Sequence, residues 1–425
     1  MIKIILENLS KREEIFSVKS QKKDVSSIVA EIIEKVKKEG DKAIFELCEK
    51  FDKAKLTALR VSEEEIEKAY NSVDKEFIKT LEFASKNIYE FHLKQKREGF
   101  EIKKGDGTTV VGQKIIPIER AGIYVPGGTA SYPSTVLMDA IPAIVAGCKR
   151  VVMVTPPNEK GEINPYILAS AKIAGVKEIY KVGGAQAIAG LAYGTESIPK
   201  VDKIVGPGNA FVAEAKKQVF GEVSIDMIAG PSEILVISDG KSNPRFVSAD
   251  LLSQAEHDKM ASAVLVTDDL EFAKKVQLEI ERQLNELERS DIARASIDEY
   301  GKIIVTSSID SAIEIANEIA PEHLEICLDN PFTYLDKIKN AGSVFLGRYT
   351  PEAVGDYLAG TNHTLPTSGT ARFSSPLSVD DFIKKTQYIY YDEEALLKVK
   401  DKIDLFAKKE GLTAHAKSAT IRFEK

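Results

Sequence analysis

The chain of 425 residues contains only three cysteines, Cys48, Cys148 and Cys327, which lie far apart in the sequence. Three scattered cysteines provide neither a disulfide framework nor a Cys-x-x-Cys metal site, and this usage is typical of a reducing compartment. Cys148 and Cys327 stand where small buried hydrophobic residues are usual, so we expect no thiol-dependent reaction at either. We therefore expect a cytoplasmic protein.

A surplus of basic residues is also lacking. The 58 Lys and Arg residues are outnumbered by 65 Asp and Glu residues, which gives a net charge of −7. A broad nucleic-acid surface needs the opposite balance. The apolar stretch at the start of the chain, "MIKIIL", is too short for a signal peptide or a membrane span. We expect neither nucleic acid nor a membrane as a partner.

Helical patterns fill the first hundred residues, where Ser62 and Glu65 form a capping-box pattern. Short β-rich runs then recur, most of them separated by helix-compatible stretches. These runs cover residues 151–155, 177–182, 202–206, 233–238, 262–267, 302–306 and 343–347. Strands that alternate with helices predict parallel sheets covered on both faces, with ligands bound beyond the carboxyl ends of the strands.

Two Gly/Pro-rich passages, residues 120–135 and 228–233, have the composition of paired crossings between two lobes. The sequence thus predicts an α/β fold of two Rossmann-like parallel-sheet lobes, with a helical N-terminal region and a helical C-terminal tail. The predicted divisions are an N-terminal extension (1–20), a first lobe that carries the catalytic and metal residues (21–123 with 233–379), an inserted lobe on the cofactor side (124–232) and the tail (380–425).

Two glycine-containing loops, within residues 181–194 and 205–219, each follow a strand and open a helix. Glycine lets backbone amides approach an anionic ligand, and a helix N-terminus favours the negative charge. Neither loop completes the Gly-x-Gly-x-x-Gly fingerprint, because Phe211 occupies the third glycine position after Gly206 and Gly208. Tight strand–helix turns remain the alternative explanation for each loop.

Histidine is scarce, with five residues in the whole chain: His92, His257, His323, His363 and His415. His92 flanks a helical apolar stripe, so we expect a packing or surface role for it. The other four stand in polar, Gly- or Pro-punctuated stretches at element ends, where active sites are usually built. A hydrogen-bonded core histidine is the alternative for each one taken alone.

Gln254 and His257 stand three residues apart, a spacing that places both on one side of a helix. With Asp356 and His415 they would form a set of two imidazoles, one amide and one carboxylate. Such a set suits Zn²⁺ or another first-row divalent ion better than Ca²⁺ or Mg²⁺. Spacing alone does not bring these distant residues together, so a shared site is a hypothesis at this point.

Eight motifs in order resemble the histidinol dehydrogenase family. Four stand in the carboxyl half: "SQAEHD" (253–258), "APEHLEI" (320–326), "EAVGDYLAGTNHTLPT" (352–367) and "EGLTAHAKS" (410–418). Four precede them: "GIYVPGG" (122–128), "GGAQAIA" (183–189), "GPGNAFVAEAK" (206–216) and "AGPSEILV" (229–236). The resemblance implies oxidation of L-histidinol to L-histidine through L-histidinaldehyde, the last steps of histidine biosynthesis, with NAD and one zinc ion per subunit.

The resemblance also assigns roles to individual residues of this chain. It implies the zinc ligands Gln254, His257, Asp356 and His415, and the acid/base pair Glu322 and His323. It implies substrate contacts by Ser232, Gln254, His257, His323, Asp356, Glu410 and His415, and NAD contacts by Tyr124, Gln186 and Asn209. His363 lies in the matching "GTNH" segment, where we expect it within reach of the substrate. The family resemblance further implies a homodimer in which Glu410 and His415 complete the neighbour's site.

The adjacent acid/base pair raises a geometric question. Neighbouring side chains point to opposite faces of a strand and about 100° apart in a helix. Glu322 and His323 can therefore serve one site only if Pro321 marks an irregular turn, which is our expectation.

Two other functions also fit the residues. A zinc hydrolase would use the same ligands to activate water, and it predicts turnover without NAD. A two-lobed metal- or ligand-binding protein without catalysis is the other alternative, but such binders are usually exported and the chain begins with no visible export signal.

Overall fold

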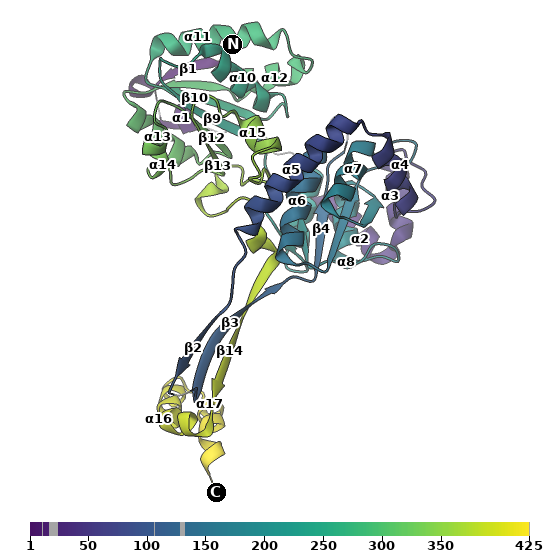
Figure 1. Ribbon diagram of the computed structural model, residues 1–425, viewed down its shortest axis with the longest axis vertical. Helices are drawn as coiled ribbons and strands as arrows, with labels where there is room; N and C mark the ends of the chain where they lie inside the picture. The colour runs from purple at the N-terminus through teal and green to yellow at the C-terminus, as the bar shows by residue number, and fades with distance from the viewer. Residues whose placement is uncertain (11, 17–23, 106, 128–131, 425) are drawn as a thin grey trace. The chain divides into compact units, whose positions relative to one another are not determined.

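The computed structural model describes residues 1–10, 12–16, 24–105, 107–127 and 132–424 (Figure 1). The chain forms two compact units. Unit 1 consists of Met1–Gln95 and Ile118–Phe382, and unit 2 consists of Lys96–Pro117 and Ile383–Lys425. Residues 128–131, which include the last glycine of the motif "GIYVPGG", lie outside the described residues.

The first sheet of unit 1 has six parallel strands in the order β1-β11-β10-β9-β12-β13. The strands are β1 (Lys3–Leu6), β9 (Glu233–Ser238), β10 (Ser262–Thr267), β11 (Lys302–Val305), β12 (His323–Cys327) and β13 (Ser343–Leu346). The helices that accompany them are α1 (Arg12–Phe16), α10 (Pro244–Ala255), α11 (Leu270–Leu284), α12 (Ser290–Glu299), α13 (Ile309–Ile319), α14 (Phe332–Leu335) and α15 (Glu352–Tyr357).

Alternation along the strands explains why this sheet is covered on both faces (Figure 1). In β9, Ile234 and Val236 share a core with the apolar sides of α10, α11 and α12. Leu235 and Ile237 point to the other face and share a core with α13. A strand buried on both faces needs a continuous apolar run, which residues 234–237 provide at the centre of "EILVIS".

The second sheet of unit 1 has five parallel strands in the order β6-β5-β4-β7-β8. The strands are β4 (Arg120–Tyr124), β5 (Arg150–Thr155), β6 (Glu178–Lys181), β7 (Lys203–Val205) and β8 (Ser224–Ile225). The helices of this part are α2 (Ser26–Glu39), α3 (Asp41–Phe51), α4 (Glu63–Ser72), α5 (Lys75–Leu93), α6 (Pro133–Ala146), α7 (Pro165–Ala174), α8 (Gly184–Tyr193) and α9 (Ala210–Val219). The capping box predicted at the start of α4 is confirmed.

The packing of α2 and α3 differs from the predicted grouping of residues 21–123 with 233–379. The buried stripe of α2, which includes Val29, Ile33 and Val36, shares a core with α8, α9 and the strands of the second sheet. The lobe boundaries as a whole stay a prediction.

The first residues of the chain belong to a sheet, although the sequence predicts an extension there. Residues Lys3–Leu6 pair in parallel with Lys302–Val305 of β11 at the edge of the first sheet. The short apolar run at the start is therefore an edge strand. No helix in the described ranges is long and apolar enough to cross a membrane.

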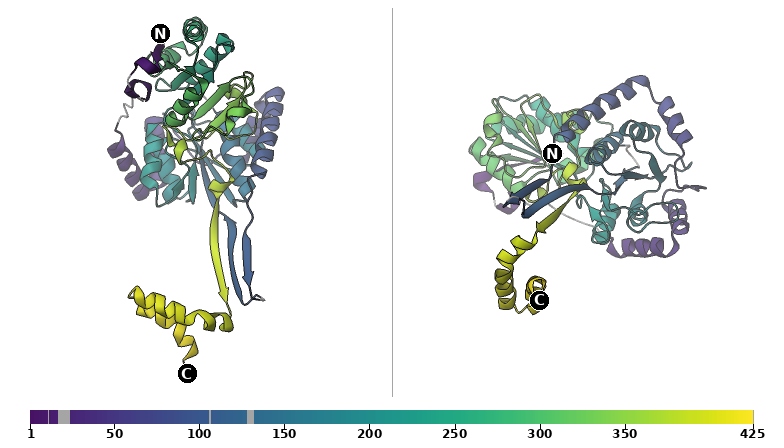
Figure 2. Two further views of the ribbon diagram at one scale, coloured as in Figure 1. Left: turned by 90° about the vertical axis from the view of Figure 1, so that its left-hand side faces the viewer. Right: turned by 60° about the horizontal axis from the view of Figure 1, so that its bottom comes forward.

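Unit 2 contains an antiparallel sheet and a helical end. The sheet has the order β14-β3-β2, with β2 (Phe100–Lys104), β3 (Thr109–Pro117) and β14 (Ile383–Tyr391). The helices α16 (Glu393–Lys409) and α17 (Thr413–Thr420) follow β14 and contact each other (Figure 2). Gly112 pairs with Tyr388, and a Cβ at Gly112 would collide with the ring of Tyr388. The tail is thus helical only after a long strand, which the sequence interpretation did not include.

Candidate active site

A buried group of polar side chains forms where three elements of the first sheet meet. His323 is the first residue of β12, Gln254 lies in the last turn of α10, and Glu352 and Asp356 stand four residues apart on α15. A ring nitrogen of His323 and one carboxylate oxygen each of Glu352 and Asp356 lie within 4.8 Å of one another. His323, Gln254 and Glu352 are all buried. Such a concentration of ionisable groups is typical of a functional site.

The imidazole of His323 is oriented by its Nδ1 atom. This atom lies 3.0 Å from the carbonyl oxygen of Glu233 and 2.9 Å from Nε2 of Gln254. An Nδ1–H that donates to the carbonyl leaves the lone pair of Nε2 free. Nε2 faces two carboxylates, with Oε1 of Glu352 at 3.9 Å and Oδ1 of Asp356 at 3.8 Å. The free nitrogen is therefore the one that can accept a proton.

The surroundings shift the pKa values of these groups. Burial alone lowers the pKa of His323, but the negative charges of Glu352, Glu322 and Asp356 outweigh it and raise the pKa well above its ordinary value. Burial raises the pKa of Glu352 to about 7 and that of Glu322 to about 8. The imidazolium form of His323 is thus stabilised, and the two glutamates exchange protons near neutral pH.

Glu322 and His323 reach the same place because the backbone is irregular before β12. Ala320 ends α13 in a left-handed conformation with φ of 55°, and Glu322 lies in a bend ahead of the strand. Oε2 of Glu322 lies 3.7 Å from Nδ1 of His323 and accepts a hydrogen bond of 2.9 Å from the backbone N–H of Glu233. The irregular turn expected at Pro321 is therefore present.

His257 lies in the turn that follows α10, where its backbone N–H donates to the carbonyl oxygen of Gln254 at 3.1 Å. Burial lowers the pKa of His257, and the nearby charge of Asp356 opposes this effect. The pKa of Asp356 is lowered although burial raises it, because the nearby imidazoles of His323, His363 and His257 stabilise its negative charge. Three of the four predicted metal ligands, Gln254, His257 and Asp356, therefore belong to one neighbourhood.

Three buried polar atoms of this neighbourhood have no hydrogen-bond partner within the part of the chain that the structure describes. They are Oε1 of Gln254, Nε2 of His323 and Oε2 of Glu352. Buried polar atoms are almost always satisfied, so a group of unsatisfied ones calls for an explanation such as a bound ion. An amide oxygen, imidazole nitrogens and carboxylates form a donor set that fits a divalent first-row ion.

The remaining residues predicted to contact or reach the substrate lie in three places. Ser232 directly precedes β9, and its carbonyl oxygen accepts a hydrogen bond of 2.9 Å from Ser262. Nε2 of His363 lies 3.3 Å from the hydroxyl oxygen of Ser134, and burial lowers the pKa of His363. Glu410 and His415 belong to unit 2, where both side chains are exposed at the end of α16 and in α17.

The three predicted NAD contacts lie on the side of the second sheet where its strands have their carboxyl ends. Tyr124 is the last residue of β4, Gln186 lies in the first turn of α8 after β6, and Asn209 is the N-cap of α9 after β7. The hydroxyl oxygen of Tyr124 accepts a hydrogen bond of 3.1 Å from the backbone N–H of Gly184. These positions are the carboxyl ends of parallel strands, where α/β sheets bind ligands.

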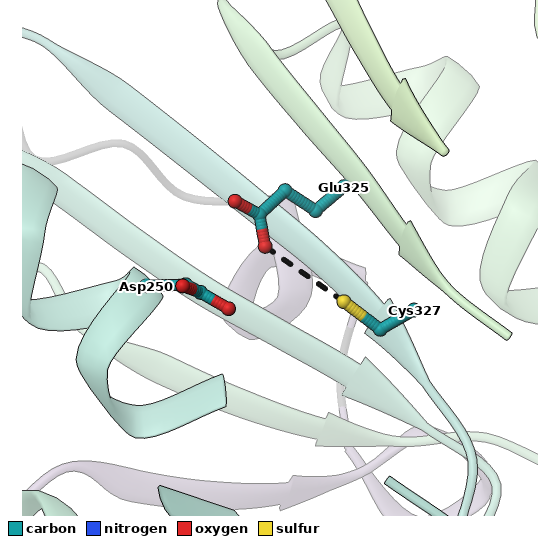
Figure 3. Close-up of side chains that lie close together, drawn as sticks. All are labelled: Asp250, Glu325 and Cys327. Atoms are coloured by element: carbon teal, nitrogen blue, oxygen red, sulfur yellow. Dashed lines mark hydrogen bonds between the residues drawn. The ribbon is translucent and has the colours of Figure 1, made fainter. Parts of the chain in front are cut away.

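The prediction from sequence overlooked several buried acids. Glu352 was overlooked although it stands four residues before Asp356, a spacing that places both on one side of a helix. Glu233 was overlooked as well, and burial raises its pKa to about 7. A second group, Asp250, Glu325 and Cys327, has ligand atoms within 4.8 Å of one another (Figure 3). No spacing pattern in the sequence indicates this second group.

Comparisons with known proteins agree on one family. The family model described as "Histidinol dehydrogenase" matches residues 17–423. The chain is 57% identical over 401 residues to a protein of Clostridium acetobutylicum named histidinol dehydrogenase, covering 94% of this chain and 93% of that one. A Bacillus cereus protein of the same name is 55% identical over 423 residues, covering 100% of this chain and 96% of that one. A solved structure named histidinol dehydrogenase, from Elizabethkingia anophelis, matches with a TM-score of 0.94 and 43% identity, covering 99% of this chain and 98% of that chain.

Proposed function

This chain belongs to the histidinol dehydrogenase family, and we propose that its buried acid/base site performs both oxidations that convert L-histidinol, through L-histidinaldehyde, to L-histidine. The protein is an oxidoreductase that oxidises histidinol in histidine biosynthesis. We further propose that the enzyme uses zinc and NAD, that it forms the aldehyde intermediate with the residue roles given below, and that it acts in the cytoplasm. The observation that carries the proposal is the unpartnered Nε2 of buried His323, held by Glu233 and facing two carboxylates.

We assign the zinc site to Gln254, His257, Asp356 and His415. The unpartnered Oε1 of Gln254 and the charge of Asp356 beside His257 support this assignment. When bound, the ion would supply a positive centre for the amino and imidazole nitrogens of histidinol, which fixes the carbinol carbon. Glu410 is proposed to neutralise the substrate ammonium, whose nitrogen can bind the ion only after it has lost its proton.

The first oxidation moves a hydride from the carbinol carbon to the nicotinamide and a proton from the hydroxyl to Nε2 of His323. The raised pKa of His323 makes it a strong base, and the step uses molecules in which Nε2 carries no proton, a fraction that grows as the pH rises. The imidazolium that forms is stabilised by Glu352 and Asp356, whose oxygens lie 3.9 and 3.8 Å from Nε2. The Nδ1–H remains on the carbonyl oxygen of Glu233, so the ring need not turn when the proton arrives.

The second oxidation requires a hydrated aldehyde, because an aldehyde carbon has no hydroxyl group to lose a proton. Glu322 is proposed to take a proton from the attacking water. Its pKa of about 8, raised by burial, lets it gain and lose a proton near neutral pH. Hydride then leaves the hydrate for a second NAD⁺, and the carbon becomes the carboxyl carbon of histidine.

We propose that NAD binds at the carboxyl edge of the second sheet. Tyr124, Gln186 and Asn209 stand at or after the carboxyl ends of β4, β6 and β7, and the helix that Asn209 caps presents its N-terminus on the same side of the sheet. Backbone amides at such an N-terminus favour the phosphates of a dinucleotide. The remaining proposed substrate contact is Ser232, before β9.

The enzyme is also proposed to act as a homodimer. Glu410 and His415 belong to unit 2, whereas the other proposed ligands belong to unit 1. A second copy of the chain is the proposed source of both residues for each site.

The test supplies purified protein with zinc, NAD⁺ and L-histidinol and counts the NADH formed for each histidine. A ratio of two supports the proposal, whereas turnover that does not depend on NAD⁺ indicates the hydrolase alternative. The variant His323→Gln should lower kcat by about 10²-fold or more, because a positioned acid/base group contributes that much. The matched control is His92→Gln: His92 is also buried, but its ring nitrogens lie beside the carbonyl oxygen of Ile88 and the amide of Asn362, and it has no proposed role in the oxidation. Equal losses in the two variants would contradict the assignment of His323.

A further inference from the structure

Glu325 connects the strand that carries His323 to the helix that carries Glu352 and Asp356. It stands two residues after His323 on β12, so both side chains point to the same face of the sheet. The intervening Leu324 belongs to the apolar core on the opposite face. Oε1 of Glu325 accepts a hydrogen bond of 2.8 Å from the backbone N–H of Glu352, the first residue of α15.

This contact takes the place of a helix cap. The first N–H groups of a helix have no partner inside the helix, and a polar side chain at the N-cap usually accepts from them. The N-cap of α15 is Pro351, which makes no side-chain hydrogen bond. Glu325, from another element and fully buried, supplies the acceptor instead.

Asp250 and Cys327 complete the surroundings of Glu325 (Figure 3). Asp250 stands one turn before Gln254 on α10, and the thiol of Cys327 donates to Oε2 of Glu325 at 3.8 Å. Two buried carboxyl groups this close cannot both be ionised. Burial and the charge of Asp250 raise the pKa of Glu325 well above its ordinary value, so Glu325 can donate to Asp250 while it accepts from α15.

We propose that Glu325 is a positioning residue of the oxidation site: by joining β12 to α15 and to α10, it sets the spacing between His323 and the carboxylate of Glu352. The inference rests on the proposed role of His323 as the proton acceptor. If the connection is removed, the first turn of α15 is free to shift. A displacement of about 1 Å in an acid/base site can cost a large factor in rate.

The test compares Glu325→Gln with Glu325→Leu. Glutamine keeps the acceptor for Glu352 and a donor toward Asp250, so kcat should stay within about 3-fold of the original protein. Leucine removes both, and kcat should fall by about 10-fold or more. The matched control is Cys327→Ala, which removes another buried member of the same group but leaves the hydrogen bond to α15 intact, and it should keep kcat within about 2-fold.

A double-variant cycle separates positioning from general damage. When Glu352→Gln is already present, adding Glu325→Leu should lower kcat by less than about 2-fold, because the carboxylate that Glu325 is proposed to position has already been removed. Full additivity of the two losses, or a loss in Glu325→Gln equal to that in Glu325→Leu, would overturn the proposal.

Two further measurements distinguish a failure of the inference about Glu325 from a failure of the proposed role of His323. If Glu325→Leu does not fold, amide hydrogen exchange in the unaltered protein decides: the N–H of Glu352 should be protected, and rapid exchange there overturns the inference. Activity that survives His323→Gln would instead remove the proposed role of His323, and it would do so whatever the Glu325 variants show.

Discussion

At the scale of single residues, Asp139 is a buried carboxyl group outside the oxidation site with a strongly raised pKa. It lies on α6 and is completely buried. Its Oδ1 accepts a hydrogen bond of 2.7 Å from Thr364, whereas its Oδ2 has no partner among the residues that the structure describes. Burial raises the pKa of Asp139 to about 8, so the carboxyl group is mostly neutral at pH 7.

The variant Asp139→Asn should therefore change how stability depends on pH. The unfolded chain loses this proton near pH 4, whereas the folded protein keeps it until about pH 8. The proton thus contributes stability at low pH that is lost as pH rises through this window, by at most about 1.4 kcal/mol per pH unit. Between pH 6 and pH 7.5 the unaltered protein should lose up to about 2 kcal/mol relative to the variant. Urea unfolding at both pH values measures this.

The matched control for that experiment is Asp336→Asn, which changes an exposed aspartate. Its unfolding free energy should follow that of the original protein at both pH values. Parallel pH dependence of Asp139→Asn and the original protein would show that Asp139 is ionised in the folded state.

At the scale of elements, a buried ion pair holds the loop that precedes α9. Lys216 on α9 pairs with Asp226, which follows β8, and both side chains are almost completely buried. Asp226 accepts the N–H of Gly206 at 2.8 Å, and Lys216 donates to the carbonyl oxygen of Gly206 at 2.9 Å. Gly206 has φ of 113°, and a Cβ there would collide with the carbonyl oxygen of Tyr124. The pair thus fixes the backbone that leads to Asn209.

Because the proposed NAD site includes Asn209, removing this pair should weaken NAD binding more than folding, provided that both charges are removed together. Lys216→Met alone leaves Asp226 buried and unpaired, which costs about 3–5 kcal/mol. The double variant Lys216→Met, Asp226→Leu should recover most of that stability, because a well-packed apolar pair often replaces a buried ion pair without loss. We expect the KM of this double variant for NAD⁺ to be about 10-fold higher than that of the original protein. Its kcat should differ from the original value by less than about 3-fold.

Lys217→Met is the control, since Lys217 is the exposed neighbour on the same helix. It should leave the KM for NAD⁺ unchanged. A double variant that recovers both its stability and its affinity for NAD⁺ would remove the ion pair from any role in positioning the loop.

The elements that sequence predicted best are those buried on both faces. The runs at 233–238 and 262–267 match β9 and β10 at both ends, because a continuous β-branched run between polar residues has few other interpretations. β14 was not predicted, since its side chains are mostly exposed and its residues "IKKTQYIYY" carry no buried alternation. β1 was not predicted as a strand either, because its four residues are buried by a partner strand that lies about 300 residues later in the sequence.

In the site, too, the sequence predicted residues that stand in motifs but not contacts between distant elements. Glu322, His323 and Gln254 were found because they stand in motifs, and they do lie together in the structure. Glu325 and Asp250 come from different elements and meet only when α10 packs against the first sheet, so their spacing in sequence contains no signal. The hydrogen bond from Glu352 to Glu325 likewise becomes visible only when α15 is placed.

At the scale of the whole molecule, unit 2 has several large apolar side chains that are exposed. Ile389 of β14 is 72% exposed, and Leu405 and Phe406 of α16 are 61% and 67% exposed. Contiguous exposed apolar groups mark interaction sites. This surface stands on the same unit as Glu410 and His415, which supports the proposal that a second copy of the chain both covers it and receives these two residues.

Mixed dimers test that arrangement. A subunit with His415→Ala and a subunit with His257→Ala are each inactive as homodimers if both residues are zinc ligands. In a mixed dimer with exchanged tails, one site combines the intact His257 of the first subunit with the intact His415 of the second, while the other site lacks both. Random mixing after dissociation should therefore restore about a quarter of the original activity, because half of the dimers are mixed and each has one complete site. Zinc content should rise in parallel, from the values of the two parents to those expected for one complete site per mixed dimer. If each chain supplied its own His415, every site in the mixture would lack one ligand, and neither activity nor zinc would return.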